Sequence, residues 1–98
     1  MTMTVNFLLQ ATRVLEFGNY DETELVMITN FMVGIDEEVL SEYKCTCTIL
    51  SYENDLELYI EILNALIDVF EEREEYETCE KLKLKKEESI KINNLNTI

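Results

Sequence analysis

The sequence predicts an all-α fold, a small bundle of four to five helices that ends in a helical hairpin. Apolar residues recur at helical spacing through most of the 98 residues, and helix start signals precede several of these stretches. The chain has no proline and only two glycines, whereas a sandwich or barrel needs many turns built from them. A hydrophobic fraction of 47% is enough for a core. We therefore expect one helical domain over residues 1–92 and a frayed tail over residues 93–98.

The first two helices have clear boundaries in the sequence. Residues 4–16 carry a wide apolar face at helical spacing, and Gly18 is expected to end that helix. The second helix has the clearest start, because Asp21 can cap it and Glu24 stands where a capping box needs an acidic residue. We expect this helix to end at Gly34, with that glycine in the left-handed conformation.

The third helix begins at Asp36 and leads into an ambiguous stretch, residues 43–52. Apolar and polar residues alternate there as in a strand, and β-branched residues are frequent. However, Leu40, Tyr43 and Cys47 also fall at helical spacing. A strand would need a partner, and no second alternating segment exists, so a helix, irregular in places, is the prediction.

The fourth helix, about residues 54–70 with Asn54 as its cap, is apolar around most of its circumference. Its polar residues form one narrow stripe: Glu57, Glu61, Asn64 and Asp68. Such a helix is either central to its domain or shared with a second molecule, and the sequence leaves both interpretations open. For the second interpretation we expect a homodimer with an interface formed by Leu58, Ile62, Leu66 and Val69.

The last helix is predicted over about residues 74–92, after the polar turn EEREE. Acidic residues near its start and lysines near its end suit the helix dipole. Glu–Lys pairs at i,i+4 support its exposed side. Three residues of its first turns are expected to face the preceding helix: Tyr76, Cys79 and Leu82.

The net charge of −13 is unevenly distributed. Residues 1–80 hold Arg13, Lys44 and Arg73 against nineteen acidic residues, a net of −16, whereas the chain from Lys81 onward has a net of +3. A body this acidic repels phosphate backbones, so we expect no direct nucleic-acid binding and a basic protein partner. The candidate partner-binding acidic face consists of Glu37, Glu38 and Glu42 at one helix start and of Glu71, Glu72, Glu74 and Glu75 at the hairpin turn.

Several kinds of chemistry are not expected. Without histidine there is no imidazole base, and Cys45, Cys47 and Cys79 supply one ligand too few for a tetrahedral zinc site. Neither glycine belongs to a phosphate-binding motif, and no serine lies in a nucleophile motif. We therefore expect no enzyme, catalytic residue, metal or cofactor. No apolar run reaches the ~18 residues of a membrane span and no signal peptide is visible, so a cytoplasmic location without membrane binding is expected.

Residues 63–90 resemble the UVR-type helical hairpin of nucleotide-excision-repair proteins. That motif has an apolar helix, an acidic turn and then an aromatic-Glu-x-small-small-x-Leu-Arg segment. Matching residues here are Tyr76, Glu77, Cys79, Leu82 and Lys83, while Glu80 and Lys86 depart from the pattern. The resemblance implies a helix-pairing element for protein interaction.

The whole chain also resembles, in size and charge, the small acidic helical proteins with which bacteriophages inhibit or redirect host machinery, including anti-CRISPR-like inhibitors and DNA mimics. This resemblance implies action in the host cytoplasm. Two functional hypotheses follow. The first is an acidic inhibitor or modulator that occupies a basic, nucleic-acid-binding surface of a target. The alternative is a homo-oligomeric helical adaptor or structural protein. A salt-sensitive interaction would favour the first and a salt-insensitive apolar one the second.

Overall fold

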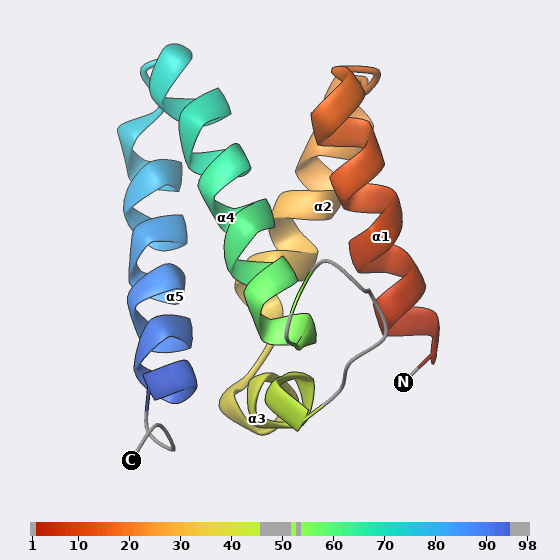
Figure 1. The fold of residues 1–98 in the computed structure, drawn as a ribbon. Coiled ribbons are helices and arrows are strands. Elements are labelled where there is room, and N and C mark those ends of the chain that lie inside the picture. Colours follow the sequence, from red (N-terminus) through yellow and green to blue (C-terminus); the bar gives the residue numbers. More distant parts are fainter. Residues whose placement is uncertain (1, 46–51, 53, 95–98) are drawn as a thin grey trace.

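The computed structural model of the chain describes residues 2–45, 52 and 54–94, with side chains from residue 7 onward. These residues form five α-helices and no strand (Figure 1). The helices are α1 (Thr2–Phe17), α2 (Glu22–Gly34), α3 (Glu37–Cys45), α4 (Asp55–Glu72) and α5 (Tyr76–Asn94). The predicted all-α fold is thus confirmed for this part of the chain. The predicted helix over residues 43–52 is confirmed only as far as Cys45, since residues 46–51 lie outside the described residues.

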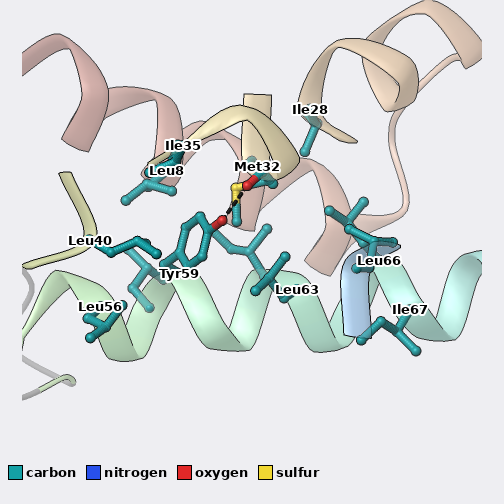
Figure 2. Close-up of a cluster of buried hydrophobic side chains, with 14 of the residues drawn as sticks. Leu8, Ile28, Met32, Ile35, Leu40, Leu56, Tyr59, Leu63, Leu66 and Ile67 are labelled. Atoms are coloured by element: carbon teal, nitrogen blue, oxygen red, sulfur yellow. Dashed lines mark hydrogen bonds between the residues drawn. The ribbon is translucent and has the colours of Figure 1, made fainter. Parts of the chain in front are cut away.

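The fourth helix, α4, is the centre of the bundle. It lies between α5 on one side and α1 and α2 on the other, and α3 lies near its N-terminal end (Figure 1). Residues from α1, α2, α3 and α4 meet in one apolar core (Figure 2). Along the predicted polar stripe, Glu61 and Asp68 are exposed, as expected for the single solvated side of a central helix. Of the two interpretations of this apolar helix, the structure supports the central position.

The predicted dimer interface on α4 is for the most part not on the surface. Leu58, Ile62 and Leu66 are buried in the core of the single chain, and Val69 is partly buried. A second molecule would be needed to cover α4 only if the other four helices left its apolar side chains exposed. The bundle covers these three side chains without a second copy, so the basis for that interface is lost.

The three predicted helix starts are confirmed by their capping hydrogen bonds. The side chain of Asp21 accepts from the Glu24 backbone N–H at 2.8 Å, and Asn54 accepts from the Glu57 N–H at 3.0 Å. Asp36 accepts from the backbone N–H three residues on, at 3.1 Å. Each cap satisfies a backbone donor that the helix itself cannot, a contribution of about 1 kcal/mol.

The two glycines end their helices differently. Gly18 follows α1 with φ +64°, a left-handed conformation that a side chain would disfavour. The prediction of the same conformation for Gly34 is wrong, because Gly34 is the last residue of α2 and extended Ile35 follows it. The end of α2 is satisfied from another helix instead: the buried Tyr59 hydroxyl donates a hydrogen bond to the Met32 carbonyl (Figure 2).

The turn of the helical hairpin is a Schellman motif without glycine. Glu74 has φ +60°, in the left-handed region. The Glu74 N–H donates to the Glu71 carbonyl and the Glu75 N–H to the Phe70 carbonyl, both at 3.0 Å. These are the two hydrogen bonds that define the motif, and they close the C-terminal end of α4.

α5 differs from the prediction in the exposure of its first residue and in the position of its last residue. Cys79 and Leu82 are buried against the bundle as expected, whereas Tyr76 is 65% exposed. Tyr76 is the first residue of α5, directly after the hairpin turn, and its side chain is not covered there. At the other end the helix continues through Asn94 rather than ending at residue 92. The Lys44 ammonium holds this end, because its Nζ donates to the carbonyls of residues 92 and 93 at 3.1 and 2.6 Å.

Candidate functional site

The two acidic groups that the sequence predicts as a binding face lie at opposite ends of the molecule. The α3 group is near the N-terminal end of α4, and the hairpin turn follows its C-terminal end (Figure 1). The 18 residues of α4 span about 27 Å at 1.5 Å per residue. All seven predicted residues are exposed, but the structure does not bring them together on one face: Glu37, Glu38, Glu42, Glu71, Glu72, Glu74 and Glu75.

The acidic residues of α3 have a structural explanation. Glu37 and Glu38 occupy the first turn of the helix, where negative charge interacts favourably with the helix dipole. Lys44 stands in the last turn, where positive charge does the same. This arrangement needs no partner to account for it.

The hairpin turn is joined by a second acidic segment. Arg73, the C-cap of α4, places a guanidinium nitrogen 2.5 Å from the Glu22 carboxylate at the start of α2. The α1–α2 turn therefore lies at the same end of the bundle as the α4–α5 turn (Figure 1). We call this surface the acidic end, and its carboxylates are Asp21, Glu22, Glu71, Glu72, Glu74, Glu75 and Glu77.

Positive charge at the acidic end is sparse. Arg73 also lies 3.9 Å from Glu75, and Lys83 lies 3.8 Å from Glu71. The hydrogen bond from Arg73 lowers the pKa of Glu22, and the same contact raises the pKa of Arg73. Neither Glu72 nor Glu74 takes part in an ion pair with any other residue that the structure describes. The surface is thus strongly negative, and most of its carboxylates are open to solvent.

Two exposed aromatic side chains accompany these carboxylates. Phe17, the last residue of α1, is 77% exposed, and Tyr76, the first residue of α5, is 65% exposed. Both stand beside the turns that form the acidic end. Carboxylates bind guanidinium groups through paired hydrogen bonds, and aromatic faces attract the same cations. The combination is suited to a surface rich in arginine.

The hairpin half of the acidic end is predictable from the sequence, and the half beside the α1–α2 turn is not. The sequence predicts only a capping role for Asp21, and it assigns no role to Glu22 or Phe17. The link between the halves is the contact of Glu22 with Arg73, residues far apart in the chain. No local pattern signals such a contact, although an arginine amid glutamates was visible.

The other kinds of site that these residues could form are a metal site, a reactive thiol and a membrane-spanning helix. Within the described part of the chain, no three Cys, Asp or Glu side chains are grouped so that they could hold a metal ion. Cys79 is buried and its Sγ lies 3.7 Å from the Ile67 carbonyl, while Cys47 is outside the described residues. Burial raises the pKa of the Cys79 thiol. No described helix combines the length and apolar character needed to cross a membrane.

Comparisons of the chain with known protein families, with curated proteins and with solved structures find no match. The arrangement of its own residues therefore carries the functional argument.

Proposed function

We propose that this protein is a non-enzymatic, acidic protein-binding module. Its acidic end occupies a basic, nucleic-acid-binding surface of a target protein and so inhibits or modulates that target. The observation that carries the proposal is the convergence of two turns, distant in sequence, on one end of the bundle, where Arg73 contacts Glu22 beside one turn and Glu75 in the other.

The chemistry of the acidic end supports a target that normally holds nucleic acid. Such a target presents lysine and arginine side chains to phosphates, and often aromatic or guanidinium planes to bases. Exposed carboxylates can replace the phosphates, and the rings of Phe17 and Tyr76 can replace the bases. A net charge of −13 also speeds the encounter with a basic surface.

The resemblance to phage-encoded inhibitors suggests where to look for the target. If the protein acts as they do, its partners are the nucleic-acid-binding proteins of the host cytoplasm. The alternative of an adaptor that assembles through α4 has less support, since three of the four residues nominated for that interface are buried within the chain.

The test uses two variants that remove the same charge at different ends. Glu72→Gln/Glu74→Gln neutralises two exposed carboxylates of the acidic end, and Glu37→Gln/Glu38→Gln neutralises two at the start of α3. Wild-type protein is immobilised and used to capture host proteins, and both variants are tested in parallel. We expect wild type and the α3 variant to retain basic nucleic-acid-binding proteins, and the acidic-end variant to lose most of them.

Two further readouts identify the surface that is bound. Capture should weaken strongly between about 50 and about 300 mM salt, because several ionic contacts are screened together. Added duplex DNA or RNA should release the captured protein by competing for the same surface. The proposal would be contradicted if salt and added nucleic acid did not change the amount of protein captured. It would also be contradicted if both variants captured the same amount.

A further inference from the structure

A second candidate surface is a groove between α1 and α2, formed by a different set of residues from the acidic end. It has a volume of about 370 Å³. Its walls are mostly apolar, and each wall carries one charged residue, Arg13 on α1 and Glu24 on α2. The lining residues are Phe7, Gln10, Ala11, Arg13, Val14, Glu24, Met27 and Ile28. Phe7 also packs against Phe31 of α2, with ring centroids 4.0 Å apart.

Large apolar side chains remain exposed around this groove. Met27, in its wall, is 58% exposed, and the adjacent Val26 is 52% exposed. Exposed apolar side chains that gather along a groove indicate a surface that another molecule covers.

The polar residues of the groove are self-complementary. Arg13 is the only basic residue among the first 43 residues of the chain. Although acidic residues are plentiful, Arg13 forms no ion pair with any residue in the described ranges, and neither does Glu24 on the opposite wall. Such a surface can pair with a second copy of itself related by a two-fold axis, because the cation of each copy then meets the anion of the other. In such an interface each contact occurs twice.

We infer that a second copy of this chain docks on the α1–α2 groove. The two helical pairs pack against each other, with Met27 of each copy entering the apolar groove of the other. Arg13 of each copy pairs with Glu24 of the other. Two molecules of net charge −13 repel each other, and this pairing places opposite charges together where the copies meet. A different acidic protein or a purely basic helix would satisfy only one of the two residues.

Solution mass tests the docking. Met27→Glu places a charge in the proposed interface, and Leu84→Glu is its matched control, because Leu84 on α5 is also 58% exposed. At concentrations up to about 1 mM, wild type and Leu84→Glu should reach twice the 11.5 kDa of the chain. Met27→Glu should remain monomeric with an unchanged far-ultraviolet circular dichroism spectrum. A wild type that is monomeric throughout, or a dimer that only Leu84→Glu disrupts, would overturn the inference.

A charge exchange tests the reciprocal pair. Arg13→Glu and Glu24→Arg should each weaken dimerisation about tenfold, because each creates two like-charge contacts. The double variant Arg13→Glu/Glu24→Arg restores both pairs with their signs reversed and should return the dissociation constant to within about threefold of wild type. If the double variant dimerises no better than the singles, the proposed pairing is wrong.

Discussion

Tyr59 shows how a single side chain fixes the arrangement of two helices. It is fully buried, and its hydroxyl donates to the Met32 carbonyl near the end of α2 (Figure 2). That carbonyl belongs to the last turn of α2, where the helix leaves acceptors without a partner. Tyr59 therefore anchors α2 to the central helix and replaces the local cap expected at Gly34. Its ring also packs edge-on against Tyr43 of α3, with centroids 6.2 Å apart.

Tyr59→Phe is expected to lower the free energy of unfolding by about 1–2 kcal/mol, because a buried carbonyl loses its donor while the ring stays in place. Urea denaturation followed by circular dichroism measures the change. Tyr76→Phe removes a hydroxyl from an exposed tyrosine and should alter stability by less than about 0.5 kcal/mol. Equal effects of the two substitutions would mean that the buried hydrogen bond contributes nothing.

The same hydroxyl makes stability depend on alkaline pH. Burial raises the pKa of Tyr59 above its ordinary value of 10.0, because the charged phenolate is disfavoured in the core. Above pH 10 the unfolded chain loses this proton while the folded chain keeps it, so stability falls as pH rises. Below pH 10 the contribution is fully present. Stability measured from pH 8 to 11 should fall less steeply for Tyr59→Phe than for wild type, and parallel curves would contradict this.

At the level of helices, the hairpin turn holds Glu74 in a backbone conformation that glutamate does not favour. Glu74 is left-handed at a position where Schellman motifs usually have glycine. Glu74→Gly should therefore raise the free energy of unfolding by about 1 kcal/mol, since it removes the clash of a side chain in this conformation. Glu72→Gly, at the last residue of α4, should lower it by up to about 1 kcal/mol, the cost of glycine in a helix interior. Thermal denaturation of both variants checks this, and destabilisation by Glu74→Gly would show that the turn needs its side chain.

The capped starts of α2, α3 and α4 were predictable and the ends of α2 and α5 were not, for one physical reason. A cap such as Asp21 or Asn54 acts on a backbone N–H three residues away, so its signal is local. The end of α2 depends on Tyr59, and the end of α5 depends on Lys44, both far away in the chain. The candidate site follows the same rule. Its hairpin glutamates were visible in the sequence, but the α2 glutamate joined them only through a tertiary contact.

For the whole molecule, the positions of the charges matter more than the net charge. The acidic end gathers carboxylates from two turns, and Arg73 is the cation that contacts both turns. Its guanidinium also lies over the Phe70 ring, 6.0 Å from the centroid. Arg73 partly offsets the repulsion between the carboxylates around it. Removing Arg73 should therefore increase that repulsion, in addition to changing the net charge.

Arg73→Gln and Lys81→Gln both change the net charge from −13 to −14. Of these two residues, Arg73 is the one that contacts carboxylates of both turns. At low salt we expect Arg73→Gln to lower the thermal midpoint more than Lys81→Gln, because repulsion among neighbouring carboxylates acts over short distances. Raising the salt to about 1 M shortens the screening length to about 3 Å, so most of the difference should disappear. The remainder should reflect the contact with Phe70. If both variants lose equal stability at every salt concentration, net charge alone governs the molecule and the position of Arg73 has no special role.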